Sequence, residues 1–381
     1  MRNEASGADR SLSVPHSERL TKGFDVVSKF FSSQFSALTP YTPGEQPQDR
    51  RYVKLNTNES PFPPSPGVVQ AAAAEAAQLQ RYSDPECTEL TRAVAAFYGV
   101  APENVLMVNG SDEVLNFAFH AWGDQDHPFI FPDITYGFYP VFAKVNHVPY
   151  REIPLRADFT VRVKDFCGVS GNVVLANPNA PTGIALPVAE IEEMVASNPE
   201  HVVIIDEAYV DFGAESCVPL IRKYDNLLVT QTFSKSRSLA GGRLGFGIAS
   251  AALIQDLNTL KYSTNPYNIN RMTAACGAAA LRDQAYYAAN AAVIQANRAY
   301  TALALKARGF TVLDSQANFL FVRAPFCSGE ALYRGLKERG VLIRHWSNAR
   351  IRDWCRVTIG TMEQMEAFLR AIDDMNFGNE E

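Results

Sequence analysis

The stretch Thr232-Phe-Ser-Lys-Ser-Arg-Ser-Leu-Ala-Gly-Gly-Arg243 decides the fold, together with the apolar run Leu227-Leu-Val-Thr230 shortly before it. The apolar run is typical of a β-strand, which places Lys235 in a hydroxyl-rich and glycine-rich loop just beyond a strand end. The hydroxyls of Thr232 and Ser234 and the guanidinium of Arg243 are the neutral donors and the fork-shaped cation that a phosphate monoester requires. The stretch therefore indicates an anion site beside a lysine, and a solvated loop is the alternative interpretation.

A second apolar run, His201-Val-Val-Ile-Ile-Asp206, ends in a carboxylate and is followed by Glu-Ala-Tyr209. Such a run is typical of a strand covered on both faces of a parallel α/β sheet, where ligands collect at the carboxyl ends of the strands. A lysine beside a phosphate site can form an imine with an aldehyde, and pyridoxal phosphate (PLP) is such an aldehyde. Asp206 would keep its pyridine nitrogen protonated, and Tyr209 would hydrogen-bond its phenolic oxygen. A helix cap is the alternative role for Asp206.

In this order and spacing, residues 206–209 and 232–243 resemble the fold-type I PLP-dependent aminotransferases, and among these most closely the histidinol-phosphate aminotransferases. The resemblance extends from about residue 38 to residue 361. It implies an α/β fold in which a mainly parallel seven-stranded sheet is flanked by helices, with a smaller α+β domain. The catalytic residues would be Lys235, Asp206 and Tyr209.

The segment Asn109-Gly-Ser-Asp-Glu113 follows an apolar run and opens a predicted helix. Unpaired N–H groups at a helix start bind anions. The resemblance implies that Gly110, Ser111 and Asp112 present their main-chain amides to the PLP phosphate. A helix cap made by Ser111 or Asp112 is the alternative. The same phosphate would be held by Thr232, Ser234 and Arg243.

Three tyrosines have expected places in this arrangement. The resemblance implies that Tyr136 stacks on the PLP ring, whereas we expect Tyr139 to be a core residue. Tyr82, in Arg81-Tyr82-Ser-Asp-Pro, resembles a family tyrosine that reaches the PLP phosphate of the neighbouring subunit. The active site would then exist only in a homodimer, and an exposed turn tyrosine is the alternative.

The segment Asn177-Pro-Asn-Ala-Pro-Thr-Gly183 departs from the commonest family pattern. In that pattern an asparagine directly before Pro-Thr-Gly hydrogen-bonds the phenolic oxygen of PLP, and here Ala180 occupies that place. Asn177, Asn179 or Tyr209 alone would then supply the contact.

Three residues point to the substrate by resemblance. Arg356, in Arg356-Val-Thr-Ile-Gly360, matches an arginine that binds the substrate carboxylate, and a bidentate guanidinium suits a planar carboxylate. Arg344 matches an arginine that binds the phosphate of histidinol phosphate, and Tyr41 matches a tyrosine that contacts this phosphate across the dimer. We therefore expect transfer of an amino group between L-histidinol phosphate and 2-oxoglutarate in histidine biosynthesis.

Other functions remain open at this point. An aromatic amino acid aminotransferase is one alternative, because four side chains leave room for an aromatic substrate: Phe62, Phe138, His345 and Trp346. An L-threonine phosphate decarboxylase-like enzyme is a second, although Leu55-Asn-Thr-Asn-Glu59 resembles the aminotransferases more closely. A regulatory module that binds PLP without turnover is the non-enzymatic alternative.

Composition limits the classes of protein that this chain can belong to. A net charge of −6 gives no electrostatic footprint for nucleic acid or an anionic membrane, and no apolar run approaches the roughly 20 residues of a membrane span. The six cysteines have neither metal-site nor disulfide spacing, so we expect reduced thiols, no metal and a cytoplasmic protein.

The 381 residues suggest about two domains. We expect a disordered leader at 1–22 and an N-terminal helix (24–35) with an extended arm to residue 66, which joins the small domain and the dimer interface. A large PLP-binding domain would span 67–270 and a small α+β domain 271–381. Alternating apolar runs predict the strands of the large sheet at 105–108, 129–131, 173–175, 202–205, 227–230 and 246–248.

Overall fold

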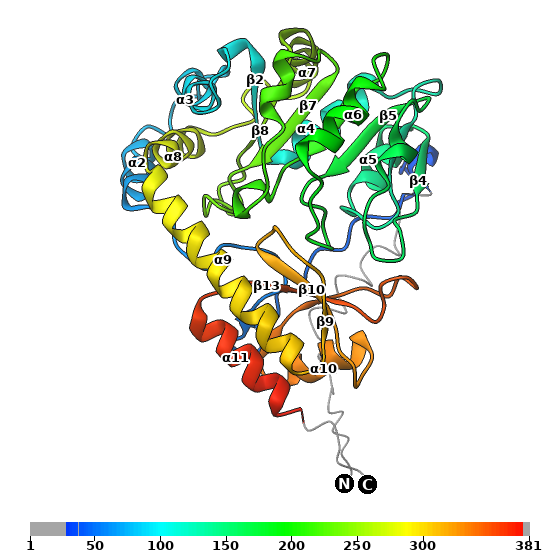
Figure 1. The fold of residues 1–381 in the computed structure, drawn as a ribbon. Coiled ribbons are helices and arrows are strands. Elements are labelled where there is room, and N and C mark those ends of the chain that lie inside the picture. The colour runs from blue at the N-terminus through cyan, green and yellow to red at the C-terminus, as the bar shows by residue number, and fades with distance from the viewer. Residues whose placement is uncertain (1–27, 37, 376–381) are drawn as a thin grey trace, which may run out of the picture.

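A computed structural model describes residues 28–36 and 38–375, so the predicted leader lies outside the described residues (Figure 1). The larger sheet has seven strands in the order β2-β8-β7-β6-β5-β3-β4. All six predicted runs form strands of it. The edge strand β4 was not predicted, because its two central residues are charged and it has neither an apolar run nor alternation. The strands are β2 (Val105–Val108), β3 (Phe129–Pro132), β4 (Tyr150–Ile153), β5 (Asn172–Ala176), β6 (Val203–Asp206), β7 (Leu227–Thr232) and β8 (Gly245–Ala249).

The sheet is mainly parallel, as predicted, and only β8 runs antiparallel to its two neighbours. Successive side chains of a strand point to opposite faces. In β6, Val203 and Ile205 therefore belong to one apolar cluster, whereas Ile204 belongs to the cluster on the other face. The buried strands need helices on both faces, and this is why the apolar runs are nearly continuous.

Helices cover both faces of this sheet (Figure 1). The first face is covered by α2 (Pro66–Ala76), α3 (Thr88–Tyr98), α6 (Val188–Ala196) and α8 (Arg271–Arg282). The other face is covered by α4 (Ser111–Trp122), α5 (Tyr139–Val145) and α7 (Ala251–Thr264). Gly99 ends α3 with a left-handed φ of 64°, a conformation that glycine adopts without strain.

The long helix α9 (Gln284–Ala307) runs from α8 to the smaller part of the molecule, where it packs beside α11 (Met362–Asp373) (Figure 1). There a four-stranded sheet has the order β12-β13-β10-β9, and α10 (Gly329–Glu338) packs beside it. Its strands are β9 (Thr311–Val312), β10 (Phe319–Arg323), β12 (Arg344–His345) and β13 (Cys355–Thr358). The predicted domain boundary before residue 271 falls at the start of α8 and stays a prediction.

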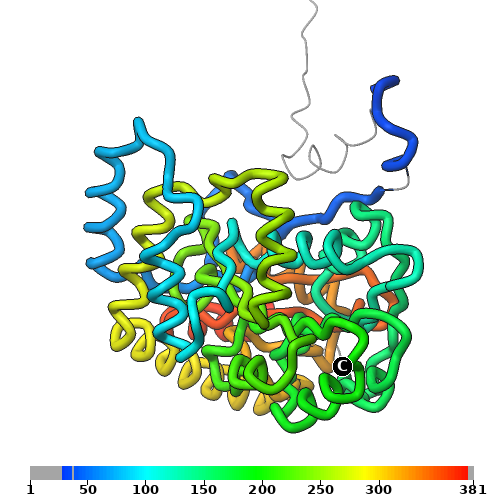
Figure 2. The backbone as a smooth tube through the Cα atoms, turned by 90° about the horizontal axis from the view of Figure 1, so that it is seen from above, coloured from blue at the N-terminus to red at the C-terminus, as the bar shows by residue number. Residues whose placement is uncertain are grey.

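The N-terminal arm crosses the molecule from one edge to α2 at the opposite edge (Figure 2, dark blue). It is extended, as its prolines predict, and its short strand β1 (Val53–Lys54) pairs in parallel with β11 (Val341–Leu342). The helix predicted at 24–35 is wrong for the described part, where only the 3₁₀ turn Ser33–Phe35 forms. Within residues 28–36 and 38–375, no helix is both long and apolar enough to cross a membrane.

Candidate active site

A cavity of about 400 Å³ opens where β5, β6 and β7 end, beside the N-terminus of α4. Because these strands are parallel, residues that are far apart in the sequence meet at this edge. The arm and the loop after β7 close the other sides. The cavity is lined by Gln46, Thr57, Glu59, Ser111, Asp112, Tyr136, Ala176, Ala180, Asp206, Ala208, Tyr209, Thr232, Ser234, Lys235, Ala240, Gly241 and Arg243.

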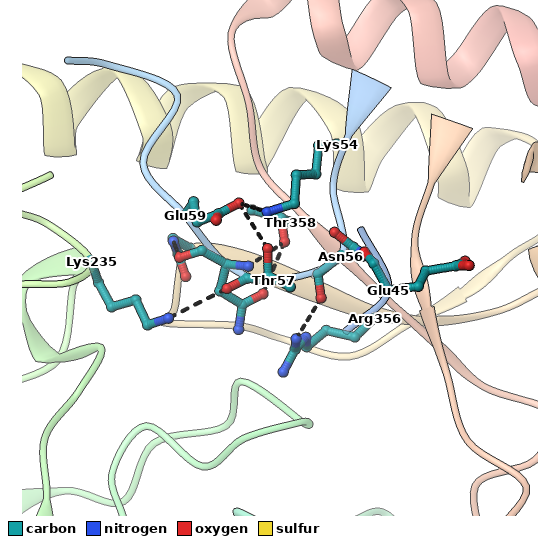
Figure 3. Close-up of polar contacts among 10 residues, drawn as sticks. Glu45, Lys54, Asn56, Thr57, Glu59, Lys235, Arg356 and Thr358 are labelled. Atoms are coloured by element: carbon teal, nitrogen blue, oxygen red, sulfur yellow. Dashed lines mark hydrogen bonds and ion pairs between the residues drawn. The ribbon is translucent and has the colours of Figure 1, made fainter. Parts of the chain in front are cut away.

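Lys235 is the one lysine among the described residues that line the cavity. Its Nζ donates a hydrogen bond of 3.4 Å to the main-chain oxygen of Thr57, on the arm (Figure 3). The same nitrogen lies 5.7 Å from the ring centre of Tyr209. The amine is therefore held inside the cavity by weak contacts with a neutral oxygen and a ring, and no carboxylate forms an ion pair with it among the described residues.

Asp206 ends β6 and is only 4% exposed. Its Oδ2 accepts a hydrogen bond from the Tyr139 hydroxyl at 3.0 Å, and its Oδ1 accepts longer ones from Thr230 Oγ1 and the Ala208 amide. Burial raises the pKa of Asp206 to about 6, because these neutral donors do not replace the lost water. A cation beside this carboxylate would keep it ionised. Tyr139 is a core residue, as predicted, and it also orients Asp206.

The raised pKa of Asp206 makes the stability of the cofactor-free protein depend on pH. The folded protein keeps this proton between the unfolded pKa of 3.8 and about 6, so Asp206 lowers the free energy of unfolding as the pH rises through this window. The full cost, about 3 kcal/mol, is present above pH 6. We expect cofactor-free Asp206→Asn to be more stable than the wild type at pH 8 but not at pH 4, as measured by urea unfolding. An equal difference at both pH values would contradict this.

The groups predicted to bind a phosphate gather at the N-terminus of α4, and we call them the anion cup: the amides of Ser111 and Asp112, the hydroxyls of Thr232 and Ser234, and the guanidinium of Arg243. Gly110 precedes this helix with a φ of 81°, and no side chain caps the helix, so the amides after it stay available. Arg243 lies beside them, where its guanidinium makes only long contacts: 3.3 Å to the main-chain oxygen of Ala240, 3.4 Å to Ser234 Oγ and 3.5 Å to Asp112 Oδ2. The Thr232 hydroxyl also lines the cavity and accepts the amide of Ser234. Long contacts of this kind are readily exchanged for an anion.

Tyr136 and Tyr209 both line the cavity, and their contacts with PLP stay predictions. The Tyr136 hydroxyl donates to Asp112 Oδ1 at 2.7 Å. Burial and this carboxylate together raise the pKa of Tyr136. Ala180 lines the cavity too, whereas the lining includes neither Asn177 nor Asn179.

Both asparagines near Ala180 are occupied elsewhere. Asn177 exchanges two hydrogen bonds with the main chain of Leu186. Asn179 binds Thr135, Thr182 and the main-chain oxygen of Ile134. They hold their own loop in place, and of the three candidates for this contact only Tyr209 lines the cavity.

Arg344 and Arg356 are paired residues on the adjacent antiparallel strands β12 and β13. Each guanidinium lies 5.5 Å from the ring centre of Trp346. Arg356 donates to the main-chain oxygen of Asn56 at 2.9 Å, but its buried Nε has no partner (Figure 3). Within the described part of the chain neither arginine forms an ion pair with a carboxylate. Burial and the neighbouring Arg344 lower the pKa of Arg356.

Five of the predicted site residues do not line the cavity of their own chain: Gly110, Tyr41, Tyr82, Arg344 and Arg356. The prediction that the Gly110 amide faces the phosphate is wrong, because this amide donates to the main-chain oxygen of Val108 at 3.0 Å. Tyr41 stacks on Phe138, with ring centres 4.2 Å apart, and Arg344 holds the same part of the arm through the main-chain oxygens of Thr42 and Pro43. Tyr82 is 79% exposed and stacks on Tyr267. The cavity lining also does not include Phe62, Phe138, His345 or Trp346.

Comparison with known proteins gives the same picture. The family model for aminotransferase class I and II matches residues 50–372. The chain belongs to this aminotransferase family.

Several relatives of this aminotransferase carry a more specific name. Histidinol-phosphate aminotransferase 1 of Bradyrhizobium diazoefficiens is 46% identical over 92% of this chain and 100% of its own. The histidinol-phosphate aminotransferase of Acetobacter pasteurianus is 45% identical over 93% of this chain and 99% of its own. The structure of histidinol-phosphate aminotransferase from Sinorhizobium meliloti in complex with PLP shares the fold, with a TM-score of 0.82 at 22% identity over 92% of this chain and 98% of that one.

The residues around the cavity of this aminotransferase fit a PLP group. An amine, a buried carboxylate and an anion cup meet in one cavity of suitable size. A Cβ on Gly110 would come within 2.6 Å of the Arg243 guanidinium, so glycine keeps the cup open. When bound, PLP would be held by Lys235, by the donors of the cup and by Asp206 at its ring nitrogen.

Sequence analysis missed Thr57 and Glu59, which the arm contributes to the cavity (Figure 3). Burial by itself raises the pKa of Glu59, but hydrogen bonds from Lys54 and Thr57 outweigh it and lower this pKa. The segment 55–59 resembles the aminotransferases, but this resemblance assigns no role to Thr57 or Glu59. Because the segment is far in sequence from the other motifs, no local pattern indicated that it enters the cavity.

Proposed function

We propose that this aminotransferase uses PLP to move an amino group between L-histidinol phosphate and 2-oxoglutarate, a step in histidine biosynthesis. The observation that carries the proposal is the pair Arg344 and Arg356. Two guanidinium groups on neighbouring strands repel each other unless an anion binds them. A phosphate dianion offsets both charges, whereas a carboxylate suits a single bidentate arginine. The names of the relatives that are about 45% identical support the same substrate.

The proposed mechanism follows from the chain's own side chains. PLP supplies an electron sink for the negative charge that develops on the substrate. Lys235 Nζ removes the proton from the substrate carbon that bears the amino group, acting as a general base. Asp206 keeps the cationic ring nitrogen paired, and Tyr209 donates to the phenolic oxygen. Arg356 would fix the phosphate of histidinol phosphate in one half-reaction and the carboxylate of 2-oxoglutarate in the other, which orients the reacting carbon.

Replacing Arg344 by alanine tests the substrate. We expect kcat/KM for L-histidinol phosphate to fall roughly 10- to 100-fold, since a hydrogen bond to a charged group is lost. L-phenylalanine has no phosphate, so its turnover should change little. The measurement is steady-state kinetics with L-histidinol phosphate, L-phenylalanine and L-threonine phosphate side by side.

Arg344 also holds the arm, and loosening the arm would lower the turnover of both amines equally. Equal losses would therefore contradict a phosphate site at Arg344. Arg323→Ala is the matched control, because Arg323 is an exposed arginine of the same sheet that stacks on Trp354. Preferred turnover of L-phenylalanine by the wild type would instead favour the aromatic aminotransferase, and carbon dioxide release from L-threonine phosphate the decarboxylase.

We also propose a homodimer in which Tyr82 reaches the cavity of the second copy. The support is the surface around Tyr82, where several apolar or aromatic side chains are exposed: Leu79, Tyr82, Tyr262 and Tyr267. Tyr41 would reach across the same interface.

We further propose a cytoplasmic location, which the six free cysteines support and cell fractionation would test.

A further inference from the structure

Asn58 is a buried residue of the arm, only 1% exposed, and every polar group of it has a partner. Its main-chain N–H donates to Thr358 Oγ1 at 3.0 Å, and its main-chain oxygen accepts from Asn318 Nδ2 at 3.0 Å. Its side-chain Oδ1 accepts from Thr358 Oγ1 and its Nδ2 donates to the Tyr209 hydroxyl, both at 2.9 Å. One residue of the arm therefore joins β13 to Tyr209 in the cavity.

These contacts fix which way the Asn58 amide points. Thr358 Oγ1 accepts the main-chain N–H of Asn58 and donates its single proton to Asn58 Oδ1. In this arrangement Oδ1 faces Thr358 and Nδ2 faces Tyr209. An NH₂ group only donates, so the Tyr209 hydroxyl accepts this bond and keeps its own proton for another acceptor.

The backbone of Asn58 also suits this role. Its φ of 56° lies in the left-handed region, which asparagine tolerates better than most residues. Asn58 lies between Thr57, whose oxygen accepts from Lys235, and Glu59, which lines the cavity. Thr358 lies two residues after Arg356 on β13. The arm is thereby connected both to the cavity and to β13, the strand that carries Arg356.

We propose that Asn58 is a positioning residue: it directs the Tyr209 hydroxyl proton into the cavity, toward the phenolic oxygen of PLP. The proposal rests on the proposed role of Tyr209. That role matters more in this chain than in the commonest pattern, because Ala180 brings no donor and Asn177 and Asn179 are engaged elsewhere. Asn58 thus makes the remaining hydroxyl a donor of fixed direction.

The test is a pH titration of the visible absorption band of the PLP-loaded protein, without turnover. A hydrogen bond to the negatively charged phenolic oxygen of PLP lowers the proton affinity of the linkage between PLP and Lys235. Losing the hydrogen-bond donor therefore raises the pH midpoint of the titration. We expect Tyr209→Phe to raise the midpoint by about one pH unit. Asn58→Gly keeps the left-handed backbone accessible and should raise it by about half of that or more.

The double variant decides whether Asn58 acts through Tyr209. In the Tyr209→Phe background, Asn58→Gly should leave the midpoint where it is, because no hydroxyl remains to be directed. An equal shift in both backgrounds, or no shift from Asn58→Gly beside a clear one from Tyr209→Phe, would overturn the proposal. No shift from Tyr209→Phe would remove the role of Tyr209 and the proposal with it.

Two further variants guard against effects on folding. Asn318→Ala loosens the same loop but leaves the Asn58 amide on Tyr209, so it should not move the midpoint. A midpoint raised as far as in Asn58→Gly would overturn the proposal. If Asn58→Gly does not fold, Thr358→Val replaces it, because without this hydroxyl nothing fixes the amide direction. A raised midpoint is then expected, and an unchanged one counts against the proposal.

Discussion

Replacing Lys235 by alanine should lower turnover by roughly 10⁴-fold or more and abolish the visible absorption band of the PLP-loaded protein. The Lys235 amine is both the attachment point for PLP and the general base. No other lysine of residues 28–36 and 38–375 lines the cavity. Single-turnover kinetics and absorbance spectra of the reconstituted variant are the measurements.

Two controls separate this loss from misfolding. Lys235→Arg keeps the positive charge but cannot form the linkage, so it should be as inactive as the alanine variant. Lys306→Ala removes a half-exposed lysine of α9, paired with Asp314 at 3.8 Å, and should keep full turnover. Turnover within tenfold of the wild type in Lys235→Ala would refute the assignment.

The same variant tests the proposed dimer. Lys235→Ala protomers lack the amine, and Tyr82→Ala protomers lack the tyrosine that would reach the second copy. Refolding the two together should restore part of the activity, because a mixed dimer has one cavity with both groups. No recovery in a mixture shown by light scattering to be dimeric would contradict a shared site.

Replacing Arg356 by alanine should have the second largest effect, a fall in kcat/KM of about 10²- to 10³-fold. Arg356 has a buried Nε without a partner, so an anion that binds there loses a desolvated charged contact in the variant. The loss should appear with L-histidinol phosphate and with 2-oxoglutarate alike, unlike the selective effect of Arg344→Ala. Half-reaction kinetics followed by absorbance measure the two separately.

Arg356→Lys is the companion variant, since lysine keeps the charge but not the two-pronged geometry. It should recover only a small part of the loss. Arg356 also lies 5.3 Å from the ring centre of Phe319, so a structural role alone would lower the unfolding temperature and leave kcat/KM unchanged. That outcome would exclude Arg356 as the anion-binding residue.

Local patterns in the sequence were sufficient for the fold class. The strands β5, β6 and β7 each contain an apolar run because both faces of the sheet are covered, and each run is followed by a polar motif. A parallel sheet must bring such ends together, so Asp206, Thr232 and Lys235 could be assigned to one site in advance. The edge strand β4 and the end of the predicted helix at 24–35 had no comparable signal.

The sequence by itself determined the sheet and the residues that follow its strand ends, because both depend on neighbours within a few residues. Only the tertiary structure decided how the arm enters the cavity, which places Glu59 in its wall and Asn58 on Tyr209. It alone also paired Arg344 with Arg356 and turned Tyr139 toward Asp206. Contacts between distant segments depend on how whole elements pack, and no local periodicity records that packing.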